Sequence, residues 1–477
     1  MKKIITAALS ILLLGACKKD ITSLNVNPKT PTTVPAASLF TQAQHTLANT
    51  LTSANVNLNN FRLVEQMWQE TTYTDESNYN FITRPIPDND WNAFYRDILY
   101  NLKLAKGIIP TDISITDAKV KANDIAIADI MQVYTYYYVL TTFGNAPYTD
   151  ALDPTNLFPK YDDAATVYAD LLKKLDADVA SMTATSASYG AADIIYSGDV
   201  PSWIKFANTL KLKMGITIAD SDPATAKTVI TAAVTAGVFA SNDDNAKFTY
   251  LGATPNTNPV WVDLVQSGRN DFVACTTYTT NLLSYTDPRL PLFFTTDAAG
   301  SYSGGIPGAS SDFNTFSHPS AKIEAADFPG LLLDYSETAF NLAEATERGF
   351  IATGTSAATY YNDAVTASII YWGGTATQAT TYLAQPTVNY ATAAGTYKQK
   401  IGTQKWFALY NRGWDAWIET RRLDYPVLVA PPTALTVFPE RLRYPAAEQN
   451  INGANYATAS AAIGGDVPGT KLFFDKF

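Results

Sequence analysis

The sequence has few of the residues from which disulfide scaffolds and many enzyme centres are built. Only two cysteines and two histidines occur among 477 residues. Cys17 and Cys275 cannot form a framework of disulfides, and His45 and His318 lie far apart in the chain. A zinc centre or a serine triad would have to rest on a single histidine. We therefore expect both histidines to be structural or surface residues, and Cys275 to be a small buried apolar residue.

The short motifs of common catalytic sites are also missing. There is no G-x-S-x-G elbow, Walker loop, C-x-x-C pair or H-E-x-x-H helix. The stretch SNDDNAKF (241–248) lacks the glycine and the last glutamate of a calcium loop, so we interpret it as a turn. A glycosidase needs only two carboxyl groups, and the pairs Glu65 with Glu70 or Asp75 with Glu76 are possible. Helix-surface and loop positions explain these acids better.

Basic residues are outnumbered, and long apolar runs are absent after the N-terminus. The 34 Lys and Arg face 44 Asp and Glu, which gives a formal net charge of −10. No basic stripe stands out, so nucleic acid is not expected as a partner. A content of 47% hydrophobic and 16% charged residues is typical of a folded globular protein.

The N-terminus is built like an export signal. Lys2 and Lys3 precede the apolar run Ile4–Leu14, which is too short to cross a bilayer core about 30 Å thick. The following Leu14-Gly15-Ala16-Cys17 resembles a bacterial lipobox. We predict a lipoprotein signal peptide over 1–16 and a lipid on Cys17; an ordinary signal peptide with a chance cysteine is the alternative.

The rest of the chain divides into a tether and a body. Residues 17–35 are polar and rich in Pro, Thr and Asn, which is typical of a flexible tether. We assign 36–477 to a single, mostly α domain. Apolar residues at helical spacing predict helices over Leu39–Leu51, Asn60–Glu70, Trp91–Ile108 and Asn411–Leu423.

Two further helices carry clear start and stop signals. Asp222 and Pro223 predict a helix start, and Gly237 predicts its end. In DYSETAFNLAEATERGF the pattern predicts an end at Gly349, with these residues facing inward: Tyr335, Ala339, Leu342 and Ala343. Glu344 and Glu347 are predicted to face solvent. Such helix pairs resemble tetratricopeptide-type hairpins, without a clean repeat. Residues 290–326 and 373–403 are expected to form long loops, and the proline-rich C-terminal region packed coil.

Aromatic residues are abundant, with 28 Tyr, 22 Phe and 8 Trp. A sugar ring packs its C–H face on Trp or Tyr, while its hydroxyl groups need polar neighbours. The segment TTYTDESNYNFITRPIPDND combines both and has no helical period. The ligand-binding candidates are Tyr73, Asp75, Asn78, Tyr79 and Phe81 in this segment, with Tyr302 and Trp372 in later Gly-rich stretches. Each ring is also compatible with core or loop packing.

Several stretches together resemble the SusD/RagB family of nutrient-binding lipoproteins. They occur in the family's order from near Leu39 to near Asn450: VYTYYYVLTTFGNAPYTDAL, YDDAATVYADLLKKLDA, GDVPSWIKFANTLKLKMGITIA, DPRLPLFF, LAEATERG, QKWFALYNRGWDAWIETRRLDYP and PERLRYPAAEQN. One departure is the basic pair often seen in the family's LKLR-x-x-x-R helix, which is Lys213 and Thr217 here. This departure places an ion pair of that helix in doubt.

The resemblance implies a mostly α fold with a scaffold of tetratricopeptide-like helix pairs and a loop-rich, irregular ligand-binding half. It implies an outer-membrane lipoprotein at the cell surface that has no cofactor besides the lipid on Cys17 and catalyses nothing. The implied partners are a SusC-like TonB-dependent β-barrel transporter and a glycan or peptide ligand. Two other interpretations stay open: a lipid-anchored all-α glycoside hydrolase, and an adaptor that grips proteins with its helices.

Overall fold

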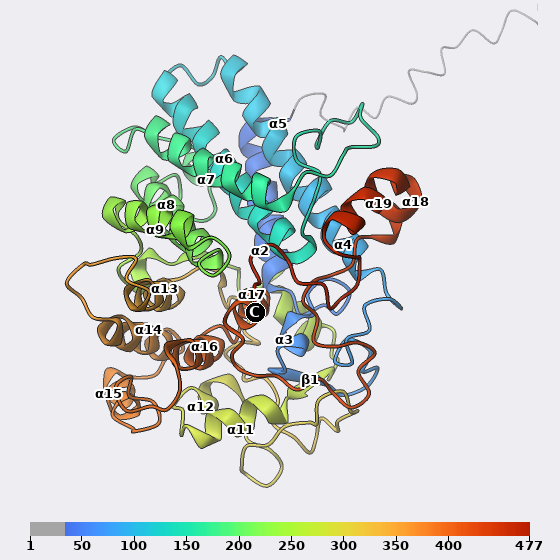
Figure 1. The fold of residues 1–477 in the computed structure, drawn as a ribbon, viewed down its shortest axis with the longest axis vertical. Coiled ribbons are helices and arrows are strands. Elements are labelled where there is room, and N and C mark those ends of the chain that lie inside the picture. The colour runs from blue at the N-terminus through green and yellow to red at the C-terminus, as the bar shows by residue number, and fades with distance from the viewer. Residues whose placement is uncertain (1–33) are drawn as a thin grey trace, which may run out of the picture. The chain divides into compact units, whose positions relative to one another are not determined.

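The computed structural model of the protein describes residues 34–477 (Figure 1). The predicted signal peptide (1–16), the predicted lipidation site Cys17 and nearly all of the predicted tether lie outside these residues. Ala36–Phe477 form one unit. Within the described part of the chain, no helix is both long and apolar enough to cross a membrane.

The described residues are mostly helical, as predicted. The helices are α2 (Ala36–Thr52), α3 (Phe61–Val64), α4 (Ile86–Asn92), α5 (Tyr100–Ile108), α6 (Ala118–Phe143), α7 (Ala164–Ser181), α8 (Val200–Thr217), α9 (Pro223–Ala236), α10 (Pro259–Trp261), α11 (Thr276–Ser284), α12 (Leu290–Phe293), α13 (Tyr335–Glu347), α14 (Ala357–Tyr371), α15 (Ala376–Leu383), α16 (Tyr397–Ala408), α17 (Gly413–Leu423), α18 (Ala446–Ile451) and α19 (Gly453–Ala462). A π-helical stretch, Ala93–Leu99, joins α4 to α5.

Strands are few and short. β1 (Trp68–Glu70) pairs antiparallel with β3 (Phe272–Ala274), and β2 (Ala246–Phe248) pairs antiparallel with β4 (Gly330–Leu333). Each pair joins segments that are far apart in sequence. The β1–β3 pair is important for the site because it brings the residues after Glu70 next to those before Phe272.

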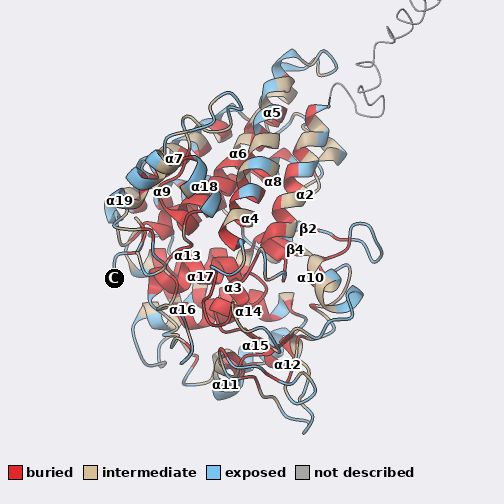
Figure 2. Ribbon diagram, turned by 90° about the vertical axis from the view of Figure 1, so that its right-hand side faces the viewer, coloured by how far each residue is buried: buried red, intermediate tan, exposed pale blue. Residues whose placement is uncertain are grey.

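Successive helices pack as pairs, which confirms the helix-pair scaffold. α6 packs on α7, α8 on α9, and α13 on α14, and these pairs stack one above another on one side of the ribbon (Figure 1). In the same view α11 and α12 lie at the bottom, and α3 and β1 lie to the right of the pairs among long coils (Figure 1). Buried residues concentrate where the helices meet, and the coils carry most of the exposed ones (Figure 2).

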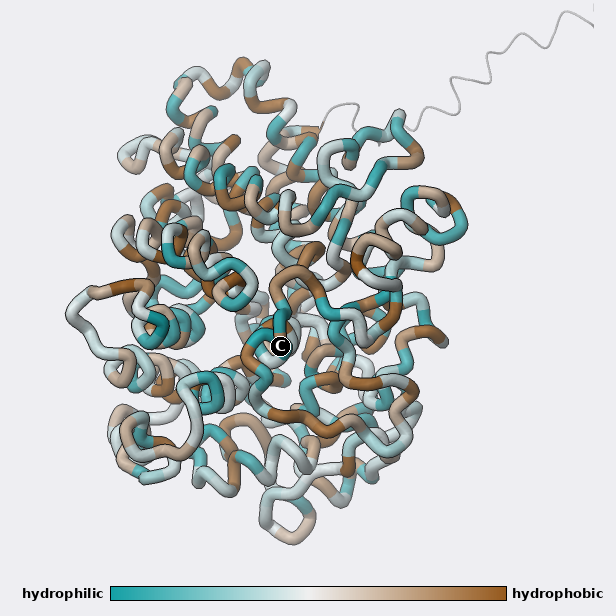
Figure 3. Tube along the Cα trace, in the orientation of Figure 1, coloured by the Kyte–Doolittle hydropathy of each residue, from teal (hydrophilic) through white to brown (hydrophobic). Residues whose placement is uncertain are grey.

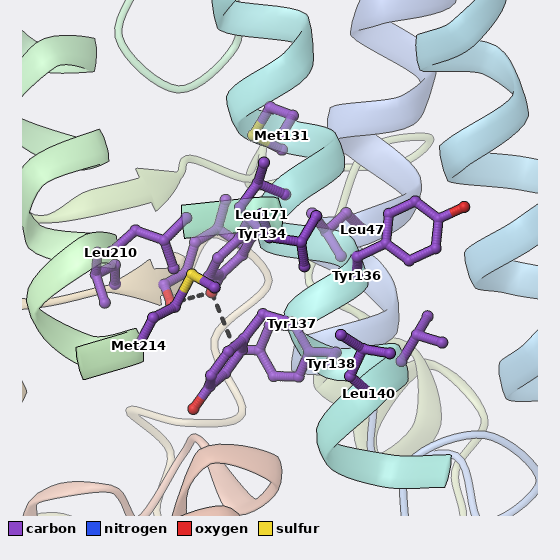
Figure 4. Close-up of a cluster of buried hydrophobic side chains, with 14 of the residues drawn as sticks. Leu47, Met131, Tyr134, Tyr136, Tyr137, Tyr138, Leu140, Leu171, Leu210 and Met214 are labelled. Carbon is purple, nitrogen blue, oxygen red and sulfur yellow. Dashed lines mark hydrogen bonds between the residues drawn. The ribbon is translucent and has the colours of Figure 1, made fainter. Parts of the chain in front are cut away.

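Helix α6 lies at the centre of the main core. Its C-terminal half is buried on every side. A helix that is buried in this way is typically hydrophobic all round. Tyr134, Tyr137 and Tyr138 are fully buried among Leu and Met side chains of neighbouring helices (Figure 4). Their hydroxyl groups still find partners, since Tyr138 donates to the Asp415 carboxylate at 2.9 Å. The tyrosine run therefore serves packing.

A buried ion network ties the helix pairs together. The Lys213 ammonium of α8 lies 2.7 Å from Glu337 of α13 and 2.5 Å from Asp415 of α17. Arg412 joins the same two carboxylates, at 2.8 Å and 2.7 Å. The replacement of the family's basic pair by Lys213 and Thr217 had placed an ion pair of this helix in doubt. The ion pair is present and is formed by Lys213. Thr217 instead donates its hydroxyl to the Lys213 carbonyl.

Several helix boundaries agree with the sequence signals. The Asp222 side chain accepts from the Thr225 amide at 3.1 Å, and Gly237 follows α9 at a φ of 100°, as predicted. The prediction of a helix over Asn60–Glu70 is wrong after Val64. Gln66 adopts a φ of 52°, which ends the helix, and the next residues join β1.

Two other predictions are also wrong. Residues 373–403 are not one loop, because Thr375 and Gln378 form a capping box that starts α15, and α16 begins at Tyr397. Glu344 does not face solvent. It is buried and forms a two-bond ion pair with the Arg422 guanidinium, with both N–O distances 2.7 Å. The helix-face pattern could not show that a distant arginine lies opposite.

Candidate ligand-binding site

Three coil segments meet on the loop-rich side of the molecule. We name them the aromatic loop (71–85), the Gly-Ser loop (297–318) and the proline-rich segment (426–439). Asn78 joins all three. Its side-chain amide donates to the Gly308 carbonyl at 2.8 Å, its side-chain oxygen accepts from the Thr433 hydroxyl, and its carbonyl accepts from the Leu435 amide. One buried asparagine therefore sets the relative position of the three segments.

Further hydrogen bonds fasten β1, directly before the aromatic loop, to the Gly-Ser loop. Gln69 accepts from the Gly308 amide at 3.0 Å and donates to the Ala309 carbonyl at 2.9 Å. Gly308 has a φ of +78°, and a Cβ there would lie 2.4 Å from the Asn78 side-chain oxygen. This close approach requires glycine.

A cleft of about 380 Å³ opens beside the aromatic loop. Its walls come from the end of α2, the aromatic loop, and the segment between α10 and β3. It is lined by Ala54, Asn55, Val56, Asn57, Tyr73, Arg84, Asp263, Ser267, Arg269, Asp271 and Phe272. The Tyr73 ring is 73% exposed at this cleft. An exposed tyrosine beside several polar side chains suits a ligand that has both C–H faces and hydroxyl or amide groups.

Charges of both signs surround the cleft. Arg269 donates to Asp271 at 2.6 Å, and the Arg84 Nε lies 3.2 Å from Glu76. Burial raises the pKa of Asp263 to about 6, and its buried Oδ2 has no hydrogen-bond partner. Asp263 also lines the cleft, and a carboxyl group there can accept a hydrogen bond from a ligand hydroxyl or N–H group.

Two acids lie beneath the aromatic loop. Burial and a hydrogen bond with Glu76 raise the pKa of Glu70 to about 9. Burial also raises the pKa of Glu76. Glu70 accepts from the Ser77 amide at 3.0 Å and from its hydroxyl at 2.6 Å. Through Ser77, Glu70 thus holds the aromatic loop against the end of β1.

The structure brings the five candidates of the aromatic loop into one region but exposes them unequally. Tyr73 lines the cleft, and Asp75 accepts from the Asn80 amide at 2.6 Å. Tyr79 is 2% exposed, receives a hydrogen bond from Gln66, and packs edge-on against Phe438. With Asn78 buried as well, only Tyr73 presents an open ring to this cleft. Phe81 lines a neighbouring cavity.

The other two candidates lie elsewhere. Trp372 is 2% exposed, and its ring centroid lies 4.8 Å from that of Phe293 and 5.5 Å from that of Tyr410. Tyr302 is half-buried and packs against the same cluster. A fully packed ring has no face for a sugar, so in this conformation Trp372 serves the core.

The earlier candidates for catalysis and metal binding are accounted for by packing. Within residues 34–477, no group of three or more His, Cys, Asp or Glu is placed to hold a metal ion. His45 packs edge-on against Phe248, His318 stacks on Phe313, and Cys275 is buried as expected. Of the nominated acids, Glu65, Glu70 and Glu76 are buried, so the interpretation as exposed helix-surface and loop residues is wrong for these three.

Sequence reasoning missed most of the polar residues of the cleft. Arg84 belongs to the same irregular segment as Tyr73, so the composition of that segment could have indicated that Arg84 takes part in the site. Asp263, Arg269 and Asp271 come from a segment without any distinctive motif. They reach the cleft because the Thr71 amide donates to the Asp271 carbonyl at 2.9 Å, a continuation of the β1–β3 pair.

Comparison with known proteins gives a consistent result. Residues 28–445 match the SusD-like family described as "Starch-binding associating with outer membrane". No curated protein matches the chain. Several solved structures match it. One, titled a chitin-binding protein, is 26% identical, with a TM-score of 0.79 over 93% of this chain and 100% of that chain.

Two further structures show the same similarity. A SusD homolog from Bacteroides uniformis is 26% identical, with a TM-score of 0.79 over 92% of this chain and 99% of that one. A chitin-binding SusD homolog from Flavobacterium johnsoniae is 23% identical, with a TM-score of 0.76 over 92% and 98%. At that identity it supports the fold alone.

Proposed function

The chain belongs to the SusD-like family, and from that membership we propose that it is a lipid-anchored protein of the outer cell surface. In this proposal it binds a nutrient oligosaccharide in the cleft at Tyr73 and passes it, chemically unchanged, to a SusC-like TonB-dependent transporter. The observation that supports ligand binding most directly is the 73% exposed Tyr73 ring at a cleft of about 380 Å³. That volume lies in the range of small-ligand sites, roughly 300–1,000 Å³.

The cleft's chemistry favours a glycan. Tyr73 offers an apolar face, Arg84 and Arg269 offer donors, and Asp263 offers a carboxyl group as acceptor. Sugar hydroxyl groups both donate and accept, so one sugar can satisfy all of these groups. A similar structure, 26% identical, is titled a chitin-binding protein.

A peptide ligand is the second candidate, because charges of both signs also suit backbone amides and termini. A binding screen of detergent-solubilised full-length protein against arrays of glycans and peptides tests the proposal. We expect retention on a class of oligosaccharides, which the substitution Tyr73→Ala weakens. Binding to peptides alone would replace the glycan assignment, and conversion of any polysaccharide to products would favour the hydrolase interpretation.

The transporter partnership is supported by an exposed apolar stripe. Four aliphatic residues of the proline-rich segment are 62–77% exposed: Val427, Val429, Leu435 and Val437. The extended chain after α17 is mostly brown in the hydropathy view (Figure 3). A surface of this kind, joined through Asn78 to the ligand loops, is typical of a protein contact. We expect a large β-barrel protein to copurify from envelopes with the full-length chain, whereas soluble partners alone would favour the adaptor interpretation.

A further inference from the structure

A second cavity, of about 400 Å³, adjoins the aromatic loop. It lies between that loop and the start of α18. It is lined by Phe81, Ile82, Thr83, Arg84, Pro85, Pro87, Asp88, Arg443, Tyr444, Ala446 and Gln449. None of the residues that carried the proposed function, apart from Arg84, belongs to it.

Arg84 connects the two cavities because its side chain lines both. The Arg84 Nε lies 3.2 Å from the buried Glu76 carboxylate, so the guanidinium is held in place from below. Its side chain is 29% exposed. A fixed guanidinium between two cavities can donate hydrogen bonds to ligand groups in either cavity.

The far wall of the second cavity is fixed by backbone contacts. The Asp88 carboxylate of α4 accepts from the Ala446 and Ala447 amides at the start of α18, at 3.1 Å and 3.0 Å. This contact holds α18 against α4 and keeps the hollow between them. Because both oxygens of Asp88 are engaged, the carboxylate adds little repulsion toward ligand oxygens.

The cavity offers the mixture that a sugar needs. Ile82, 70% exposed, and the rings of Pro85 and Pro87 form an apolar side. Arg443 also lines the cavity; its Nε donates to the Asp466 carbonyl at 3.1 Å, and its side chain is 39% exposed. That hydrogen bond orients the guanidinium and leaves its two Nη groups for further acceptors.

We propose that this second cavity is a subsite that binds the continuation of the glycan chain whose first units occupy the Tyr73 cleft. The inference rests on the proposed function and specifies its ligand as an oligosaccharide long enough to span both hollows across Arg84. Each cavity by itself is near the lower end of the size of small-ligand sites, roughly 300–1,000 Å³. A disaccharide fills only one of them, so affinity rises with chain length until both are occupied.

The test compares short and long members of one series. Malto-oligosaccharides and chito-oligosaccharides, each as disaccharide and heptasaccharide, are titrated calorimetrically into detergent-solubilised full-length protein. The subsite variants are Ile82→Ser, which removes apolar contact, and Thr83→Trp, which fills the hollow. Both residues are exposed, so neither change disturbs the core. Ile113→Ser, at a residue 93% exposed and outside both cavities, is the matched control.

We expect the wild-type protein to bind the heptasaccharide of one series at least tenfold more tightly than its disaccharide. Both subsite variants should lose most of that gain and keep their disaccharide affinity, while Tyr73→Ala weakens both lengths and Ile113→Ser changes neither. Wild-type affinity of both subsite variants for the heptasaccharide, with Tyr73→Ala still defective, overturns the subsite and leaves the proposed function standing. If no oligosaccharide of either series binds, the glycan function fails, and the subsite fails with it.

Discussion

The side-chain amide of Asn78 donates a hydrogen bond of 2.8 Å to the backbone carbonyl of Gly308, 230 residues later in the chain. The same side chain also donates to the Thr74 carbonyl at 2.7 Å and accepts from Thr433. A binding surface made of three coil segments needs such a centre, because coils have no ladder of their own to hold them. Together with the bonds of Gln69 and Gln66, Asn78 therefore helps to hold Tyr73 at its cleft.

Asn78→Ala should therefore loosen the ligand surface without unfolding the helices. The substitution leaves buried backbone groups unpaired, at a cost of about 1–3 kcal/mol for each. We expect faster amide hydrogen exchange at Gly308 and Leu435 and weaker oligosaccharide binding. Exchange in α6 should be unchanged.

Asn80→Ala is the matched control, because Asn80 bonds mainly within the aromatic loop, to Asp75. Equal exchange rates at the Gly-Ser loop in wild type and Asn78→Ala would show that the three segments hold together without this residue.

Tyr73 and Trp372 should respond in opposite ways to truncation. Tyr73→Ala removes an exposed ring, so we expect stability within about 0.5 kcal/mol of wild type and a loss of roughly 1–3 kcal/mol in glycan binding. Trp372→Ala empties a packed position and should cost about 3–5 kcal/mol of stability while the folded fraction binds normally. Denaturant titration and calorimetric binding on the same samples separate the two effects. A stable Trp372→Ala protein that has lost binding would place that ring at the ligand instead.

The pair Glu70–Glu76 predicts a pH dependence of stability. Burial and the hydrogen bond with Glu76 raise the pKa of Glu70 from 4.5 to about 9. The folded state therefore binds this proton more tightly than the unfolded state. The stability that the proton contributes is complete below pH 4.5, declines as pH rises, and is lost above about pH 9.

Glu70→Gln replaces the acid with an amide that stays neutral at every pH, so the variant should lose less stability as pH rises. The measurement is the difference in free energy of unfolding between wild type and variant from pH 5 to pH 9. Buried acids away from Glu70 and Glu76 titrate alike in both proteins and cancel in the difference. A constant difference across that range would mean that Glu70 is ionised in the folded protein.

The sequence predicted the helical frame because its signals are local. Asp222, Pro223 and Gly237 lie within or beside the helix that they delimit, and the periodicity of α2 is contained in a few turns. Residues 373–403 were misjudged because small Ala and Thr residues resemble loop composition, although they also form α15 and α16. Glu344 was predicted to face solvent because its partner, Arg422, lies in another helix and is not visible in the local pattern.

The site was harder to predict because exposure within the aromatic loop is decided from outside it. Tyr73 and Tyr79 lie in the same short, aromatic stretch, yet one is open and the other is 2% exposed. Gln66 donates to the Tyr79 hydroxyl at 3.2 Å and to the Val429 carbonyl at 2.7 Å, which draws the proline-rich segment over that ring. No local pattern shows such a cover.

The apolar stripe of the proline-rich segment gives the last prediction. Val427 and Val429 are 74% and 77% exposed, so replacing both with Ser changes almost nothing inside the protein. If the transporter covers this stripe, the double substitution removes apolar contact and should reduce copurification of the β-barrel severalfold, because each buried valine contributes about 1.5–3 kcal/mol. Oligosaccharide affinity of the isolated protein serves as the internal control and should be unchanged. A barrel that copurifies in full with the double variant, together with a loss of glycan affinity, would assign the stripe to the ligand rather than to the partner.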